Sequence, residues 1–277
     1  MKLVDLFDNF LIDLDGVVYV ENKPTVGAEK ALNALRGLRK RLIFLTNDPR
    51  SSPLDYSEKL KNMNIQASPD DVITSGMAIA HYIKTHFQLK QRKAYVVGSP
   101  ALKGEIEQIG VKLSQGKDAR EADFVVVGGH PKFHYGEMKL AALAIRNGAH
   151  FFGTNRDPVF PTSEGLVPAT GAILASIEVA SGKEAITAGK PEPVIFEVAM
   201  KDLTSRARTA IVGDRLDTDI VGGKRVGIKT ILVLSGSTQK DEISKSQIKP
   251  DYIITDLRDL LKEEASIINA QIPYYKQ

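Results

Sequence analysis

Short apolar runs alternate with segments of helical periodicity along almost the whole chain. The helical segments are 27–39, 53–63, 76–87, 101–109, 135–147, 171–180, 191–200 and 217–226. The strand-like runs are 10–14, 41–47, 71–75, 94–98, 123–129, 150–155, 185–189, 209–212, 230–234 and 252–255. A loop rich in glycine, proline and serine is predicted at 157–170, and a charged helix is expected after 252–255. Alternation of this kind is typical of an α/β fold with a mainly parallel sheet. The length of 277 residues predicts about two domains.

The composition narrows the function classes. With 37 basic and 34 acidic residues, the net charge of +3 is too balanced to indicate a nucleic-acid partner. The absence of cysteine excludes disulfides, thiolate metal sites and thiol catalysis. No apolar stretch reaches the roughly 20 residues that a membrane span needs. Residues 1–9 lack the pattern of a signal peptide, so we expect a cytoplasmic protein without a membrane partner.

Two acids stand at the end of the first apolar run. Asp13 lies near the end of the run 10–14, Asp15 directly follows it, and Gly16 comes next. Unpaired buried charges are costly, whereas residues two apart on a strand share one face and can border one small volume. Gly16 permits an immediate turn. The pair therefore indicates a Mg²⁺ site with a nucleophile or a proton carrier, although an Asx-type turn also explains this motif when it is taken alone.

Further polar residues follow later strand-like runs. Ligands gather at the carboxyl ends of parallel strands, so these residues are candidates for one site. Thr46 and Asn47 end the second run, and the Thr46 hydroxyl and nearby turn amides can bind phosphoryl oxygens. Lys190 can offset the charge on those oxygens. Each has a simpler alternative, namely a turn for Thr46 and Asn47 and a solvated lysine for Lys190.

A second acidic motif follows the run 209–212. Asp214 comes directly after Gly213, and Asp219 lies five positions later, near a predicted helix start. Acids are also favourable caps of helix N-termini, which is the alternative interpretation. Together with Asp13, Asp214 can hold Mg²⁺, which takes only one or two carboxylates from a protein. In the same scheme Asp13 attacks phosphorus, and Asp15 donates a proton and later accepts one.

Four of these motifs, in this order, resemble the phosphatases of the haloacid dehalogenase (HAD) superfamily. They are D-L-D-G-V-V-Y at 13–19, L-T-N at 45–47, G-K-P at 189–191 and G-D-R-L-D-T-D at 213–219. The segment between them is similar to the para-nitrophenylphosphatase or NagD-type subfamily. Its G-T-N-R-D at 153–157 and P-T-S-E-G-L-V-P-A-T-G at 161–171 match that subfamily's signatures. The resemblance covers nearly the whole chain.

The resemblance implies a Rossmann-like core of residues 1–75 and 185–277 and an inserted, smaller α/β cap of residues 76–184. It implies Asp13 as nucleophile and Mg²⁺ ligand, Asp15 as acid/base and carbonyl ligand, Thr46, Asn47 and Lys190 as phosphate-binding residues, Asp214 as metal ligand, and Asp219 as the acid that orients this cluster. Two residues depart from the pattern. Asp48 stands where many relatives carry asparagine, which affects the phosphate rim or its contact with the cap. Ala169 replaces a frequent glycine in a cap turn.

The cap is expected to exclude water and to select the leaving group. Candidate substrate contacts are His130, which follows two glycines at a strand end, and Phe160 in the loop 157–161. A phenylalanine in a loop can stack on a planar substrate, but it is more often simply packed. His134 is the weaker of the two histidine candidates.

The expected function is Mg²⁺-dependent hydrolysis of small phosphomonoesters through an aspartyl-phosphate, with 4-nitrophenyl phosphate as an artificial substrate. The alternative is a phospho-accepting, receiver-like signalling domain, which would need neither Asp15 nor the insert nor the late acidic motif. A dinucleotide-binding module is excluded because no G-x-G-x-x-G follows the first strand. Asp15 also argues against a dehalogenase. The sequence leaves open the substrate (phosphoglycolate, sugar phosphate, nucleotide or pyridoxal phosphate) and whether cap surfaces pair in a homodimer.

Overall fold

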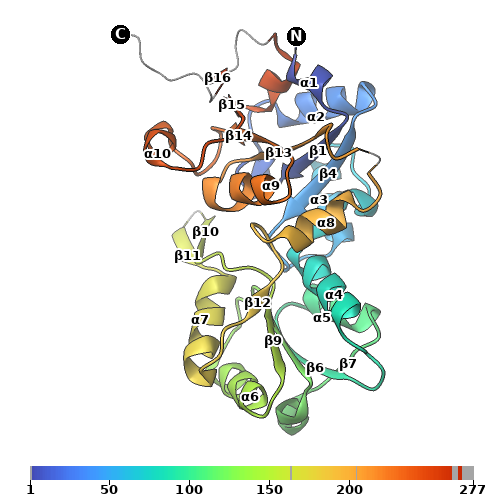
Figure 1. The fold of residues 1–277 in the computed structure, drawn as a ribbon, viewed down its shortest axis with the longest axis vertical. Helices are drawn as coiled ribbons and strands as arrows, with labels where there is room; N and C mark the ends of the chain where they lie inside the picture. The colour runs from blue at the N-terminus through green and yellow to red at the C-terminus, as the bar shows by residue number, and fades with distance from the viewer. Residues whose placement is uncertain (1, 163, 204, 264–267, 270–277) are drawn as a thin grey trace. The chain divides into compact units, whose positions relative to one another are not determined.

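The computed structural model describes residues 2–162, 164–203, 205–263 and 268–269 (Figure 1). Its described residues form two compact units. The first unit draws on Met1–Thr46, Pro53–Ile73 and Ala199–Gln277, and the second comprises Asn47–Ser52 and Thr74–Val198. Each unit has its own sheet, and the predicted α/β class with mainly parallel strands is confirmed.

The sheet of the first unit has seven strands. Their order is β16 (Ile268–Asn269), β15 (Tyr252–Ile254), β14 (Lys229–Val233), β13 (Thr209–Gly213), β1 (Asn9–Asp13), β4 (Arg41–Thr46) and β5 (Val72–Thr74). β1 pairs in parallel with both β13 and β4, β13 to β15 continue in parallel, and β16 is antiparallel to β15. Ile12 lies opposite Val212, so β1 and β13 end side by side. This register brings the acids that follow the two strands to one edge of the sheet.

Burial explains why the sequences of the central strands β1 and β13 are mostly apolar. The side chains of β1 and β13 are buried along their whole length because the strands lie inside the sheet. α2 (Ala28–Gly37) buries one face, formed by Ala28, Ala31, Leu32 and Leu35. The remaining helical elements of this unit are α1 (Leu3–Leu6), α3 (Pro53–Asn62), η1 (Pro69–Asp71), η3 (Leu216–Ile220, a π-helix), α9 (Val221–Arg225), α10 (Lys240–Lys245) and η4 (Leu257–Leu261). A short hairpin, β2 (Tyr19–Val20) with β3 (Lys23–Pro24), follows β1.

The second unit has a five-stranded sheet of its own. Its order is β12 (Ile186–Thr187), β9 (His150–Gly153), β8 (Phe124–Val127), β6 (Lys93–Val97) and β7 (Lys112–Leu113), and every pair is parallel. Its helical elements are α4 (Ser75–His86), α5 (Pro100–Gln108), η2 (Gly116–Glu121), α6 (Tyr135–Arg146) and α7 (Thr170–Ser181), and α8 (Pro193–Met200) crosses the boundary in sequence at 198–199. Buried residues of β6 and β8 pack with α6 and α7 in one core.

Two segments differ from the prediction. The region 157–170, predicted as a loop, contains the antiparallel hairpin of β10 (Val159–Thr162) and β11 (Gly165–Pro168). Its prolines and glycine are typical of turns, and the pairing of Phe160 with Val167 is a cross-strand contact that local patterns do not reveal. After β15 we expected a charged helix, but the structure has the 3₁₀ element η4 and the strand β16.

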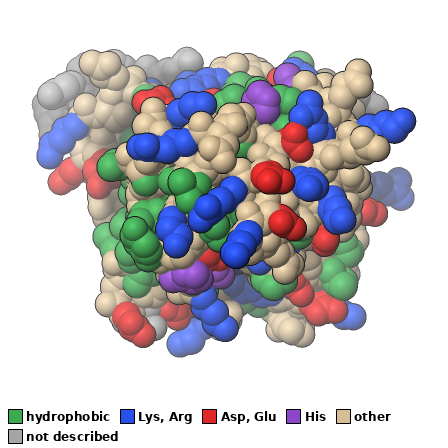
Figure 2. All heavy atoms as spheres, turned by 90° about the horizontal axis from the view of Figure 1, so that it is seen from below, with side chains coloured by type: hydrophobic (Ala, Val, Ile, Leu, Met, Phe, Trp, Pro, Cys, Tyr) green, Lys and Arg blue, Asp and Glu red, His purple; other side chains and the backbone are tan. Residues whose placement is uncertain are grey.

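The described surface carries both signs of charge. Figure 2 shows one face on which Lys and Arg side chains lie among Asp and Glu side chains, with hydrophobic side chains scattered between them. This mixture agrees with the small net charge of +3. Among the described helices, none is both long and apolar enough to cross a membrane.

Candidate active site

Three buried carboxylates meet at the edge of the first unit's sheet. Asp13 ends β1, Asp214 directly follows β13, and Asp219 lies in η3. Each offers one carboxylate oxygen, and these oxygens all lie within 4.8 Å of one another. The side chains are almost fully buried, with 7%, 3% and 0% of the residue exposed, respectively. Within the described ranges, this is the only group of acids, histidines or cysteines with such geometry.

A loop after β14 holds Asp214 in place. The backbone N–H and the hydroxyl of Ser237 both donate to Oδ2 of Asp214, at 2.6 and 2.5 Å. The backbone N–H of Thr238 donates to the Asp214 carbonyl at 3.3 Å. In the same loop, the Ser235 hydroxyl donates to the Gly16 carbonyl at 2.9 Å. The loop therefore ties the second acidic motif to the turn that follows the first.

Asp219 is oriented by its own motif. Its Oδ2 accepts the backbone N–H of Arg215 at 3.2 Å and the Thr218 hydroxyl at 3.4 Å. Gly213 leaves room for this carboxylate, because a Cβ at 213 would overlap the Asp219 side chain. The Arg215 guanidinium also pairs with Asp217. Burial alone would raise the pKa of Asp217, but the hydrogen bonds and charge of Arg215 hold it below its usual value.

The donor set fits a hard divalent cation. Three carboxylates this close and this buried repel one another unless a cation or protons compensate them. Oxygen donors of this kind suit Mg²⁺ or Ca²⁺ and do not suit soft transition metals. Close packing limits how far the cluster can relax, since a Cβ at Gly16 would lie 2.6 Å from Oδ2 of Asp214. The arrangement can therefore hold one divalent ion.

Asp15 lies beyond the strand, not on it. β1 ends at Asp13, so the strand geometry used to place both acids on one face does not extend to Asp15. Asp15 is exposed and forms a bridge with Tyr19, and Gly16 turns the chain with φ of +83°. The Gly16 N–H donates to the Tyr19 carbonyl at 2.8 Å. The Asp15 carboxylate is outside the group of three acids, so the turn sets its position.

Asn47 and Lys190 are joined within the second unit. The Lys190 backbone N–H donates to Oδ1 of Asn47 at 2.8 Å, and Nδ2 of Asn47 donates to the Lys190 carbonyl at 3.0 Å. Nδ2 of Asn47 also donates to Asp157 at 2.9 Å, and Asn155 donates to the Asn47 carbonyl at 2.6 Å. Three predicted motifs, L-T-N, G-T-N-R-D and G-K-P, therefore meet here. Thr46, buried at the end of β4, belongs to the first unit.

The two candidate cap contacts have different surroundings. His130 follows β8, and its Nε2 lies 3.3 Å from Oε1 of Glu137. Burial, with the charge of Glu137, raises the pKa of nearby Tyr95 to about 12. His134 caps α6, since its Nδ1 accepts the Gly136 N–H at 3.1 Å. The histidines thus have structural partners, whereas Phe160 on β10 lies beneath a guanidinium, as described below.

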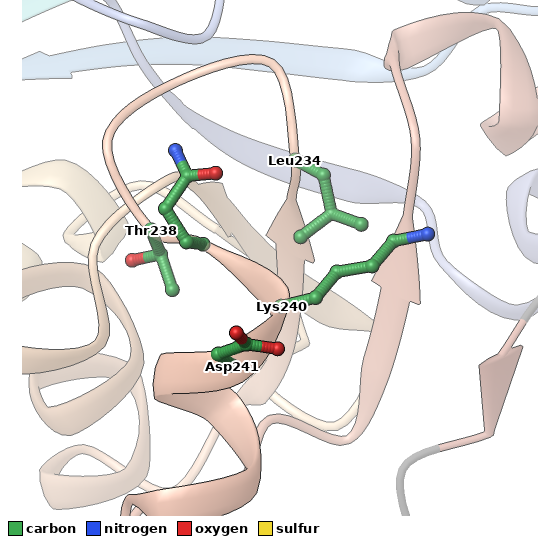
Figure 3. Close-up of a pocket in the computed structure, with 5 residues that line it drawn as sticks. Leu234, Thr238, Lys240 and Asp241 are labelled. Atoms are coloured by element: carbon green, nitrogen blue, oxygen red, sulfur yellow. The ribbon is translucent and has the colours of Figure 1, made fainter.

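The sequence prediction missed the loop at 235–238. The signal that could have identified this loop is the run Ser235-Gly236-Ser237 after a buried strand. Ligand-binding loops follow parallel strands at this position. A cavity of about 300 Å³ opens beside this loop, lined by Leu234, Thr238, Gln239, Lys240 and Asp241. Figure 3 shows Leu234 just before the loop, Thr238 in the loop, and Lys240 and Asp241 at the start of α10.

Gly236→Ala is expected to weaken metal binding about 10–100-fold, the usual cost of disturbing a ligand's support. A Cβ at 236 would overlap Oδ2 of Asp214, so the carboxylate must move. Titration of Mg²⁺ by calorimetry measures the change. Gly104→Ala in α5 is the matched control, because a Cβ there meets nothing within 4 Å. Equal Mg²⁺ affinity in both variants and the unmodified protein would contradict the assigned role of this loop.

Two family profiles match most of the chain. The profile of haloacid dehalogenase-like hydrolases matches residues 10–112, and a second HAD-hydrolase-like profile matches residues 187–260. The first match contains Asp13 and Asp15, and the second contains Asp214 and Asp219. The chain therefore belongs to the haloacid dehalogenase-like hydrolases, and within them to the phosphatases.

Similar proteins agree with this assignment. An acid sugar phosphatase of Staphylococcus saprophyticus is 36% identical over 92% of this chain and 96% of its own length. The crystal structure of a glycerol phosphate phosphatase from Mycobacterium tuberculosis in complex with magnesium has a TM-score of 0.88 and 33% identity, covering 94% of this chain and 78% of that one. A 4-nitrophenylphosphatase from Thermotoga maritima has a TM-score of 0.86 and 33% identity, covering 95% and 99%. The predicted resemblance to HAD phosphatases of the 4-nitrophenylphosphatase type is confirmed.

Proposed function

We propose that this phosphatase is a Mg²⁺-dependent phosphomonoester hydrolase that works through an aspartyl-phosphate on Asp13. The observation that carries the proposal is the buried cluster of Asp13, Asp214 and Asp219. The magnesium-bound glycerol phosphate phosphatase supports the choice of metal. A receiver-like signalling domain is not favoured, because the similar proteins are phosphatases.

In this proposal Asp13 and Asp214 hold Mg²⁺ with the Asp15 carbonyl, and Asp219 supports the cluster. Bound Mg²⁺ supplies positive charge that offsets the repulsion between an anionic nucleophile and an anionic substrate. A carboxylate oxygen of Asp13 forms a bond to phosphorus while the bond to the leaving oxygen breaks. The Asp15 carboxyl gives its proton to that oxygen.

The second half of the reaction restores the enzyme. A water attacks the phosphorus of the aspartyl-phosphate, and the Asp15 carboxylate accepts the proton of that water. The bond between phosphorus and the Asp13 oxygen breaks, and inorganic phosphate leaves. We assign Thr46, Asn47 and Lys190 to phosphate binding, with the Lys190 ammonium compensating the charge on the phosphoryl oxygens.

We further propose that the first unit acts as the phosphatase core and the second as the cap, with the insert at residues 76–184. The cap would exclude water and contact the leaving group. Asn47–Ser52 and residues up to Val198 group with the second unit by their contacts, so two proposed phosphate-binding residues, Asn47 and Lys190, belong to that unit. The substrate class is a small phosphorylated metabolite, and the acid sugar and glycerol phosphate phosphatases support a sugar or polyol phosphate.

Removal of Mg²⁺ is expected to abolish phosphate release, because the metal's charge offsets the repulsion between the anionic nucleophile and the anionic substrate. A panel of phosphorylated metabolites and 4-nitrophenyl phosphate is assayed with Mg²⁺, with a chelator, and with Mg²⁺ restored in excess over the chelator. We expect hydrolysis to stop with the chelator and to return with the metal. Full activity in the presence of chelator would overturn the metal assignment, and no hydrolysis of any substrate would overturn the proposed function.

A further inference from the structure

A two-pronged ion pair follows the L-T-N motif. The Arg50 guanidinium forms a two-pronged pair with Asp48, with Nε donating to Oδ1 at 2.8 Å and Nη2 donating to Oδ2 at 2.7 Å. The Arg50 backbone N–H also donates to Oδ1 at 3.0 Å. Two-pronged pairing fixes the plane of the guanidinium and compensates its charge. Asp48 is the residue that departs from the asparagine of many relatives.

The Arg50 guanidinium of the pair is stacked on the hairpin of the second unit. The Arg50 guanidinium carbon lies 4.4 Å from the centre of the Phe160 ring, within the range of a cation–π contact. Three residues earlier on both segments, Asn47 donates to Asp157 at 2.9 Å. Two contacts therefore join segment 47–50 to segment 157–160. Arg50 and Phe160 extend a rim that begins at Asn47, a proposed phosphate-binding residue.

The backbone beneath the pair is anchored. The Ser99 hydroxyl donates to the Pro49 carbonyl at 3.0 Å. A Cβ at Gly128 would lie 3.0 Å from Pro49, and one at Gly129 would lie 3.2 Å from Cγ of Arg50, so both glycines let the segment approach closely. Both side chains remain partly accessible, with 36% of the Arg50 side chain and 25% of the Asp48 side chain exposed. A solvent-accessible pair on an anchored segment is suited to contact a ligand.

We infer that Asp48, Arg50 and Phe160 form a specificity element that selects uncharged, hydroxyl-bearing leaving groups, such as polyol or sugar phosphates, over leaving groups that carry a carboxylate. This inference rests on the proposed phosphatase function. Asp48 compensates Arg50, so the rim offers little net attraction to a second anion, and the Asp48 carboxylate accepts hydrogen bonds from hydroxyl groups. An unpaired arginine at the same place would favour the anion.

The test compares two substrates that differ in one group. Glycerol 3-phosphate carries a hydroxymethyl group where 3-phosphoglycerate carries a carboxylate. The unmodified protein is expected to show the higher kcat/KM with glycerol 3-phosphate. Asp48→Asn keeps the shape and one acceptor but removes the charge, and should shift the ratio about fivefold toward 3-phosphoglycerate. Arg50→Gln removes the positive charge of the pair and keeps the Asp48 carboxylate, and should shift the ratio about as far in the opposite direction.

The chain contains a matched control pair. Asp256 and Arg258 have the same spacing and the same three hydrogen bonds, at 2.8, 2.6 and 2.9 Å, in the first unit. Asp256→Asn should leave the substrate ratio unchanged. Thermal melting of each variant shows whether it is folded, and the opposite signs of the two shifts cannot come from a general loss of stability.

The outcomes distinguish failure of the specificity element from failure of the proposed phosphatase function. If the unmodified protein hydrolyses phosphomonoesters but Asp48→Asn and Arg50→Gln both keep its substrate ratio, the specificity element is overturned. The proposed phosphatase function is then left intact. A preference of the unmodified protein for 3-phosphoglycerate overturns it as well. No hydrolysis of any phosphomonoester by the unmodified protein overturns both. Shifts of opposite sign that are absent in Asp256→Asn support the inference.

Discussion

Asp13→Asn is expected to lower kcat by about 10⁵-fold, the scale on which loss of a nucleophile acts in other hydrolases. An amide nitrogen or carbonyl cannot replace the carboxylate that attacks phosphorus. The fold should survive, because the substitution removes one of three mutually repelling buried charges. We expect the melting temperature of the metal-free variant to equal or exceed that of the unmodified protein.

The measurement is release of phosphate from 4-nitrophenyl phosphate, with acid quench to detect phosphate bound to protein. Asp70→Asn, an exposed acid in η1, is the control and should behave as the unmodified protein does. Turnover by Asp13→Asn close to that of the control would eliminate the covalent mechanism. An acid-stable protein-bound phosphate in this variant would point to another nucleophile.

Asp15→Asn is expected to slow turnover about 10²–10⁴-fold, the usual contribution of a general acid or base. The loss should be larger with glycerol phosphate than with 4-nitrophenyl phosphate, because 4-nitrophenolate leaves without a proton. With 4-nitrophenyl phosphate the first step then outruns hydrolysis, and phosphorylated protein accumulates. A burst of 4-nitrophenol followed by a slow steady state is the kinetic signature.

Mass measurement of the acid-quenched variant detects the trapped intermediate. A uniform loss with both substrates and no accumulated intermediate would assign Asp15 to metal binding or to the turn, since its backbone also bridges to Tyr19. The Asp70→Asn control again calibrates the effect of removing one surface carboxylate.

Much of the fold followed from local patterns. The unbroken apolar runs at β1 and β13 predicted buried parallel strands, because strands inside a sheet need apolar side chains on both faces. The face of Ala28, Ala31, Leu32 and Leu35 predicted α2. The hairpin β10–β11 was missed because its turn-forming residues give no alternating pattern, and its pairing joins residues three to nine positions apart.

The sequence likewise predicted some residues of the candidate site and missed others. Asp13, Asp214 and Asp219 could be selected from sequence because acids directly after or near apolar runs are costly unless they serve a ligand. The position of Asp15 could not be derived, because it depends on the residue at which β1 ends and on the turn at Gly16. The loop carrying Ser237 was missed because serine and glycine after a strand are ordinary turn residues.

The α/β class, the order of the motifs and the chemical types at each strand end followed from the amino-acid sequence alone, because these depend on periodicity and on single side chains. Three contacts could be found only in the folded chain: Ser237 donates to Asp214, the Lys190 backbone donates to Asn47, and Arg50 contacts both Asp48 and Phe160. Contacts between residues that are distant in sequence follow from strand register and close backbone packing. Those are properties of the assembled sheet, so no local pattern encodes them.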